Sequence, residues 1–262
     1  ISSMDSARLL EWNCWYHLLN CGFPLRTSGE TDFPCMSSTR VGQGRVYANL
    51  GEVDRVDFAA WCQAIAQGRS YVSDGYAHAL DFQVNGQGSG GTLKLDHSGK
   101  VQVTAKVAFS SQTPHGSEHG GVVPARGLRV VGDTVVMHEP LSPGQTFAGE
   151  RKLELIVNGV AVAERTIAAD DLLHEVRFDV PVERSSWIAV RQFPQLHTNP
   201  VTDEVAGRPV RASKSSARWC IDVIEQLWRA RGKSIAANER PAAREAYDKA
   251  LAIYHGIEAE SP

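Results

Sequence analysis

The sequence lacks several features that would place a protein in a functional class at once. It contains no hydrophobic run near the roughly 20 residues that a membrane-spanning helix needs, and its formal net charge is only −3. A balanced charge creates no field that would attract a polyanion. We therefore expect neither a membrane span nor nucleic acid as a partner, and a small-molecule substrate is favoured. The sequence does not indicate an oligomeric state.

Cysteine patterns and short catalytic motifs are also missing. The number of cysteines is odd, and no two of them form a C-x-x-C pair: Cys14, Cys21, Cys35, Cys62 and Cys220. This pattern favours neither a disulfide framework nor a zinc or thioredoxin-type site. The sequence also has no Gly-x-Ser-x-Gly elbow, phosphate loop or dinucleotide fingerprint. Because Ile1 is not a start residue and no export signal follows it, we expect the chain to belong to a longer protein.

The first third of the sequence predicts two helices and a long loop. Apolar residues recur at helical spacing up to Asn20, and Gly22 is placed to end this helix in the left-handed conformation. A turn-rich loop covers residues 26–43, and residues 45–50 alternate like a short strand. Asp57 is placed to cap a second short helix that ends before a glycine.

Beyond Gly75 the sequence predicts a β-sandwich. Short β-type runs are separated by Gly, Pro and Asn turns; they cover residues 80–84, 101–109, 128–131, 134–137, 153–162, 176–180 and 187–193. Asn158-Gly159 predicts a type I′ hairpin, because both residues readily take positive φ. The glycine-rich residues 85–91 indicate a turn or linker, and residues 112–149 a long connection.

The C-terminal segment predicts a pair of amphipathic helices. The first is capped by Ser215 or Ser216 and ends at Gly232. The second begins near Pro241 and ends before Gly256. Their short connection is typical of an αα-hairpin.

Several polar residues are candidates for chemistry. Asp32 lies in a polar loop, where its carboxylate could bind a divalent metal or simply cap its own turn. His115 and His119 have the spacing of a metal pair on a helix, but the glycines around them disfavour a helix, so a structural or solvent-facing role is favoured. His197 follows a predicted strand; it could bind substrate or metal, or donate to a backbone carbonyl that holds the turn.

A succession of segments carries a family resemblance. These are WYHLLNCGF at 15–23, GETDFP at 29–34, GQGRVY at 42–47, GRSYVSDG at 68–75, SWIAVR at 186–191 and HTNP at 197–200. In this order they resemble the CehA/McbA family of metallohydrolases, a branch of the PHP (polymerase and histidinol phosphatase) superfamily. The resemblance spans most of the chain.

The resemblance implies an α+β fold in three parts. Residues 1–75 would be the C-terminal remnant of a PHP-type (β/α) barrel, residues 76–212 a β-sandwich-like domain, and residues 213–262 the αα-hairpin. Asp32 would match the family's late Thr/Ser-Asp motif and be a catalytic metal ligand, and Arg45 and His197 would position the substrate. The sequence contains no His-x-His motif, so the early ligands would lie upstream of Ile1.

Two functions follow as expectations. In the first, the chain is the C-terminal portion of a metal-dependent hydrolase acting on an ester, amide or phosphoester, with Zn, Mn or Fe in the full-length protein. One ligand cannot hold a catalytic metal, so the chain alone would be inactive, and whether it is an enzyme by itself stays open. In the second, it is a non-catalytic β-sandwich module for binding or scaffolding. The location also stays open, although hydrolases that carry such sandwiches are often exported.

Overall fold

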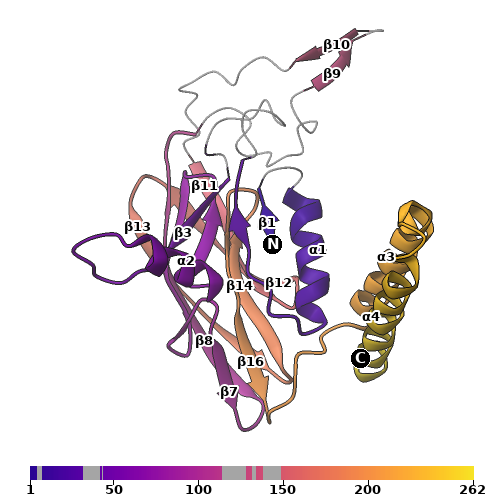
Figure 1. Cartoon of the computed structure of the whole chain (residues 1–262). Helices are drawn as coiled ribbons and strands as arrows, with labels where there is room; N and C mark the ends of the chain where they lie inside the picture. The colour runs from indigo at the N-terminus through magenta and orange to yellow at the C-terminus, as the bar shows by residue number, and fades with distance from the viewer. Residues whose placement is uncertain (5–7, 32–41, 43, 114–127, 132–133, 138–148) are drawn as a thin grey trace.

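Two β-sheets lie face to face, a helix covers the outer face of one of them, and a pair of helices lies beside that helix (Figure 1). The structure is a computed structural model, and it describes residues 1–4, 8–31, 42, 44–113, 128–131, 134–137 and 149–262. The fold is α+β, with antiparallel sheets and a C-terminal helix pair, as the sequence predicts.

The larger sheet has eight strands and combines both halves of the chain. Its central path runs β12-β11-β14-β15-β4-β3, and β16 pairs with both β14 and β7. The pairing is antiparallel except between β16 and β7. The strands are β3 (Arg45–Ala48), β4 (Ser70–Ser73), β7 (Thr92–Leu95), β11 (Gly149–Val157), β12 (Val160–Ala169), β14 (Ser186–Gln192), β15 (Leu196–Thr198) and β16 (Val201–Val205).

The smaller sheet has four strands in the order β13-β8-β5-β6. They are β5 (Ala77–Val84), β6 (Gln87–Gly88), β8 (Gly99–Phe109) and β13 (Leu173–Val182). In β8 every second residue from Val101 to Phe109 is buried, because one face of the sheet packs against the larger sheet. The main hydrophobic core therefore lies between the two sheets.

The predicted hairpin at Asn158-Gly159 is confirmed. Asn158 has φ +51° and Gly159 φ +87°, which are the positive values that a type I′ turn needs. The turn joins β11 to β12, and Val157 pairs with Val160 across it. A separate two-stranded hairpin of β9 (Leu128–Val131) and β10 (Thr134–Met137) has the predicted bounds.

The helix α1 (Arg8–Asn20) covers the outer face of the larger sheet. Its Trp12, Trp15 and Leu19 are buried against β11 and β14. Gly22 follows it with φ +88°, as predicted. A side chain at Gly22 would overlap the carbonyl of Val210, so glycine is required there for space as well as for conformation.

A short parallel pair precedes the larger sheet in the chain. Strands β1 (Ser2–Ser3) and β2 (Ser28–Gly29) pair in parallel, and α1 connects them. The described residues close no barrel, so the predicted barrel remnant is not seen as such. Instead β4 pairs with β15 as well as with β3. The strands on the two sides of residue 75 thus belong to one sheet.

The helix α2 (Phe58–Ala66) begins as predicted. The Asp57 side chain accepts from the backbone N–H of Ala59 and Ala60, and Gly68 follows the helix with φ +74°. The two hydrogen bonds to Asp57 satisfy backbone N–H donors that a helix start otherwise leaves unpaired.

The C-terminal pair consists of α3 (Lys214–Arg231) and α4 (Arg240–Glu260), joined through the 3₁₀ turn η3 (Gly232–Ser234). Two predicted bounds are wrong. The cap of α3 is Ser213 rather than Ser215 or Ser216, because its hydroxyl accepts from the N–H of Ser216. The helix α4 continues through Gly256, because the buried Ile257 anchors its last turn.

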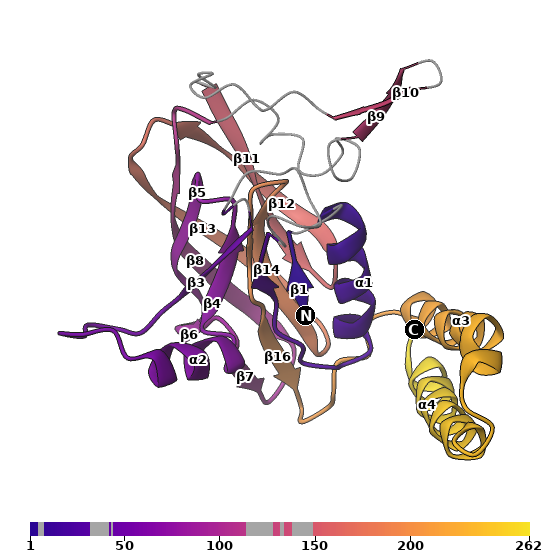
Figure 2. The ribbon, with the colours of Figure 1, turned by 45° about the horizontal axis from the view of Figure 1, so that its top comes forward.

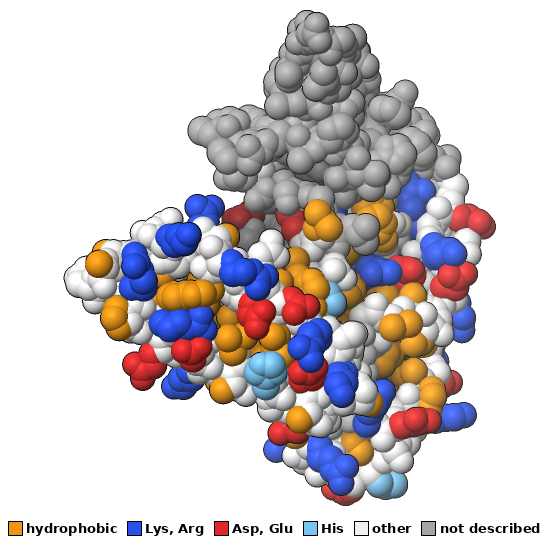
Figure 3. All heavy atoms as spheres, turned by 90° about the vertical axis from the view of Figure 1, so that its right-hand side faces the viewer, with side chains coloured by type: hydrophobic (Ala, Val, Ile, Leu, Met, Phe, Trp, Pro, Cys, Tyr) orange, Lys and Arg blue, Asp and Glu red, His pale blue; other side chains and the backbone are white. Residues whose placement is uncertain are grey.

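The helix pair lies on the side of α1 away from the sheets (Figure 2). On that side of the molecule, Lys and Arg side chains are interspersed with Asp and Glu (Figure 3). None of the described helices is long and apolar enough to cross a membrane.

Candidate functional site

Arg45 begins β3 and folds its side chain back over neighbouring backbone. Its Nε donates to the carbonyl of Gly42 at 2.6 Å, and its Nη1 donates to the Tyr47 hydroxyl at 3.3 Å. Gly75 has φ +87°, and a Cβ there would overlap this guanidinium. The glycine in the Ser-Asp-Gly segment therefore leaves the space that Arg45 occupies.

The start of β3 lies against the backbone that leaves β2. A Cβ at Gly29 would overlap the backbone of Arg45, and one at Gly44 would overlap the carbonyl of Glu30. The Thr31 hydroxyl donates to the carbonyl of Gly44 at 3.3 Å. Glycines at both positions thus permit a backbone approach that other residues would prevent.

Three predicted candidates lie outside the described residues. They are Asp32, which follows Thr31 directly in the sequence, and His115 and His119. Their assigned roles stay predictions. Within the described ranges, no group of three or more His, Cys, Asp or Glu side chains could hold a metal ion.

Next to Arg45, two tyrosines and a histidine form a compact cluster. The rings of Tyr47 and Tyr71 are stacked, with centroids 5.1 Å apart and planes 9° apart. The Tyr71 hydroxyl lies 2.7 Å from His78 Nδ1. The edge-on contact between the rings of Tyr47 and His78, at 4.9 Å, completes the cluster.

Burial shifts the pKa values of His78 and Tyr71. It lowers the pKa of His78; Asp74 opposes this effect, and the charge of Arg45 adds to it. Burial, together with Tyr47, raises the pKa of Tyr71. Both shifts favour the uncharged forms of Tyr71 and His78, the two groups that share this hydrogen bond.

A cavity of about 1080 Å³ opens beside the cluster. Its walls come from β3 and β4 of the larger sheet and from β5 and β6 of the smaller one. The lining combines aromatic, basic and amide side chains, including Tyr47, Tyr71, Phe82, Arg26, Arg69, Asn49, Gln67, Gln83 and Gln87. Such a mixture suits a small ligand that has both an apolar and a polar part.

Arg26 is the most unusual of the lining residues. Its Nη2 donates to the carbonyl of Gly90 at 2.6 Å, but its buried Nη1 has no partner among the described residues. Burial lowers the pKa of Arg26. Arg69, in the same wall, donates to the side chain of Gln67 and to the carbonyl of Asn49. Arg26 therefore brings a positive charge to the cavity wall, which would attract an anionic ligand.

His197 lies in a different place, beneath α1. Its side chain is 0% exposed and is enclosed by the rings of Trp12, Trp15 and Tyr16. Its Nδ1 donates to the carbonyl of Thr198 at 2.7 Å, which is the structural role considered from the sequence. With burial as the main cause, its pKa falls to about 3, so the ring is neutral near pH 7.

A chain of polar contacts leads from His197 toward the surface. The Tyr16 hydroxyl lies 2.5 Å from His197 Nε2 and accepts from Arg191 Nη1 at 3.2 Å. Arg191 in turn pairs with Glu154 at 2.7 Å. Burial raises the pKa of Tyr16 to about 12, although Arg191 opposes it. These contacts pair the buried Tyr16 hydroxyl and both ring nitrogens of His197, whereas the buried Nε1 of Trp12 in the same cluster has no partner among the described residues.

Arg45 and His197 project to opposite faces of the larger sheet. His197 pairs with Val72, which pairs with Val46 on β3. Since side chains alternate along a strand, Arg45 shares the other face with Tyr47. The structure does not bring the two predicted substrate-binding residues together.

Sequence inspection missed Arg26, Tyr71 and His78. Tyr47 and Tyr71 could have been noticed as aromatic residues in two short β-type segments, but their contact depends on the register between β3 and β4. Arg26 carries no local signal, because only the fold places it at the cavity wall.

No family model, curated protein or solved structure matches this chain.

Proposed function

We propose that this chain is the C-terminal portion of a metal-dependent hydrolase of the CehA/McbA type, acting on an ester, amide or phosphoester. The observation that supports the proposal is the β1-α1-β2 unit, in which two parallel strands are joined by a helix. This is the repeating unit of a (β/α) barrel, and such barrels place their functional residues just beyond the carboxyl ends of their strands. Asp32 follows the end of β2 in the sequence by three residues.

The described residues do not supply a complete metal site, because they contain no suitable group of three ligands. The proposal therefore assigns the remaining ligands to a barrel upstream of Ile1. The start of β3 lies against the backbone of Gly29 and Glu30, which precede Asp32 in the sequence, and this supports a role for Arg45 in binding the substrate. In that role the guanidinium would bind an anionic group of the substrate.

Metal content tests this proposal. We expect elemental analysis to find almost no metal in this 262-residue chain, and about one to three ions in a protein that extends upstream of Ile1. In the longer protein, Asp32→Asn should reduce both metal content and turnover. The matched control is Asp54→Asn, an exposed aspartate on the chain that precedes α2, which should change neither. Equal metal content in Asp32→Asn and the unsubstituted longer protein would contradict the proposal.

A second candidate function is supported by the cavity beside Tyr47 and Tyr71. We propose that a β-sandwich binding module would use it for a small anionic ligand with a flat apolar part. The stacked tyrosines would contact the flat part, and Arg26 would bind the anion.

Titration calorimetry with aromatic carboxylates and the matching aromatic amines tests this candidate, in the presence of a chelator. Saturable binding of the carboxylates alone supports it. Arg26→Gln should then weaken binding by about tenfold or more, whereas Arg177→Gln, on an exposed position of β13, should not. If no member of the panel binds to the folded chain, the binding module is not supported.

A further inference from the structure

Two thiols from distant parts of the sequence meet where the helix pair contacts α1. Cys21 follows the last residue of α1, and Cys220 lies in the first half of α3. Only 1% and 3% of these residues are exposed, and their thiols share a hydrogen bond. They belong to the small apolar cluster that joins α3 and α4 to the rest of the fold.

The surroundings make the two sulfurs unequal. The Tyr254 hydroxyl, from α4, donates to the sulfur of Cys220, and so does the thiol of Cys21. These two donors lower the pKa of Cys220, against the effect of burial. The pKa of Cys21 is raised, first by its hydrogen bond to Cys220 and then by burial. Cys220 is therefore the more acidic of the two thiols, and Cys21 is the less acidic one.

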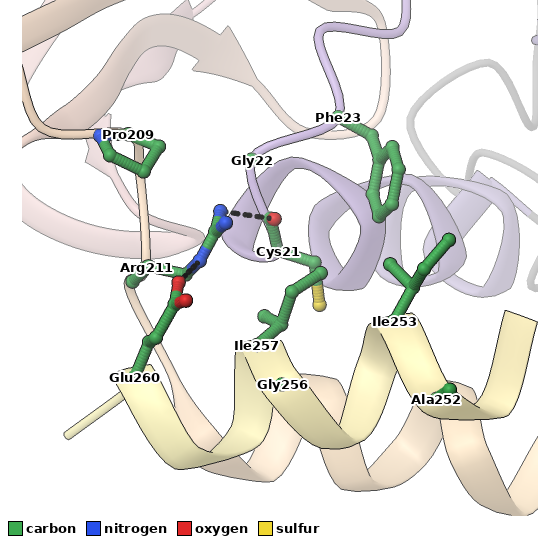
Figure 4. A pocket seen from close by; sticks show the side chains of 10 residues that line it. All are labelled: Cys21, Gly22, Phe23, Pro209, Arg211, Ala252, Ile253, Gly256, Ile257 and Glu260. Carbon is green, nitrogen blue, oxygen red and sulfur yellow. Dashed lines mark hydrogen bonds and ion pairs between the residues drawn. The ribbon is translucent and has the colours of Figure 1, made fainter.

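A small reagent has a route to Cys21, the member of the pair that lines a cavity. A cavity of about 360 Å³ is lined by Cys21, Phe23, Arg211, Ile253 and Ile257 (Figure 4). In this view the sulfur of Cys21 points from the end of α1 toward α4. Arg211 donates to the carbonyl of Cys21 at 3.0 Å and pairs with Glu260 at 2.6 Å, so the cavity wall is anchored.

We propose that Cys21 and Cys220 form a redox-sensitive dithiol, which a hydroperoxide converts into a disulfide between the end of α1 and α3. Neither residue belongs to a C-x-x-C pair in the sequence. The fold replaces that motif by bringing together two cysteines that are far apart in the chain.

The chemistry requires only the two thiols and one hydroperoxide. The Cys220 thiolate attacks the terminal peroxide oxygen, the O–O bond breaks, and the alcohol leaves with one proton. Cys220 is then a sulfenic acid. The sulfur of Cys21 attacks the sulfur of Cys220, the S–O bond breaks, and water leaves with the second proton. In total, two thiols are oxidised to a disulfide, and the hydroperoxide is reduced to an alcohol and water.

The disulfide would add a covalent bond to an attachment that is otherwise non-covalent and includes two hydrogen bonds from α1 to Ser216. The helix pair contacts α1 mainly through the small apolar cluster and through the stacking of Trp219 on His17, with ring centroids 4.3 Å apart. A bond between Cys21 and Cys220 also closes a very long loop in the unfolded chain, which favours the folded state. Oxidation should therefore raise the midpoint of thermal unfolding.

Thiol mapping of the whole chain tests the proposal without any substitution. The folded protein is treated with hydrogen peroxide, unfolded, alkylated and digested. The expected product is a peptide pair linked through Cys21 and Cys220, with a loss of two hydrogens. If both cysteines are fully alkylated at a peroxide dose that oxidises the exposed Cys62, the proposal is wrong.

Three variants test the order of the steps, in a background with Cys14→Ser, Cys35→Ser and Cys62→Ser. Cys21→Ser should stop at a sulfenic acid on Cys220 that dimedone traps, whereas Cys220→Ser should leave Cys21 open to alkylation after the same treatment. Tyr254→Phe should slow oxidation by about tenfold with an unchanged circular dichroism spectrum. Oxidation of Cys21 at an undiminished rate in Cys220→Ser would overturn the assignment.

Discussion

Asp203 places a carboxyl group inside the main core, and its removal should stabilise the protein in a pH-dependent way. It lies on β16 between Val201 and Val205, which belong to the core between the sheets. The side chain is 0% exposed, and neither oxygen has a partner among the described residues. Burial raises the pKa of Asp203 from 3.8 to about 7.

The difference between the pKa of Asp203 in the folded protein and in the unfolded chain sets the sign and size of the effect. Between pH 4 and 7 the folded protein holds a proton on Asp203 that the unfolded chain releases. The free energy of unfolding therefore falls as the pH rises through this range. A pKa change from 3.8 to about 7 corresponds to about 4 kcal/mol. Asp203→Asn keeps the shape of the protonated side chain but does not ionise.

Urea unfolding followed by tryptophan fluorescence measures the difference. The unfolding free energies of Asp203→Asn and the unsubstituted chain should be nearly equal at pH 4, and should differ by about 4 kcal/mol in favour of the variant at pH 8. Asp179→Asn, at an exposed position of β13, is the control and should show no such trend. A difference that stays constant from pH 4 to 8 would refute the argument.

Three further predictions concern local features. Tyr16→Phe removes the hydroxyl that is hydrogen-bonded to His197 Nε2, and it should lower the free energy of unfolding by about 1–3 kcal/mol. An unchanged urea midpoint would contradict this. Gly159→Ala places a side chain on a residue with positive φ and close to Tyr16, so it should lower the free energy of unfolding by about 1 kcal/mol. Gly99→Ala, where a side chain would meet open space, should lower it clearly less in the same urea assay. Asp57→Ala should cost about 1 kcal/mol through the lost cap of α2, with hydrogen exchange rising first at that helix; unaltered exchange there would show that the cap is dispensable.

Local sequence patterns predicted the elements well where a turn or a helix end depends on one or two residues. Asn158-Gly159 and Gly22 are examples, since positive φ is a property of the residue itself. The bounds of α3 and α4 were less well predicted. There Ser213 and Ile257 were decisive, and their roles depend on neighbouring side chains rather than on spacing.

The two predicted substrate-binding residues lie apart in the fold. Arg45 does lie in a cluster of aromatic and titratable residues, but His197 is buried on the other face of the same sheet. A single sequence indicates which residues carry reactive groups. It does not indicate the register between strands, and a change of one residue in register moves a side chain to the opposite face.

The sequence by itself determined the α+β class, the main turns and the C-terminal helix pair, because short-range preferences of the backbone decide these features. Only the tertiary structure decided which distant residues meet. It joined Tyr71 to His78, brought Cys21 to Cys220, and placed Asp203 in the core. The physical reason is that these contacts arise from the packing of sheets and helices, whose energy depends on buried surface rather than on local sequence.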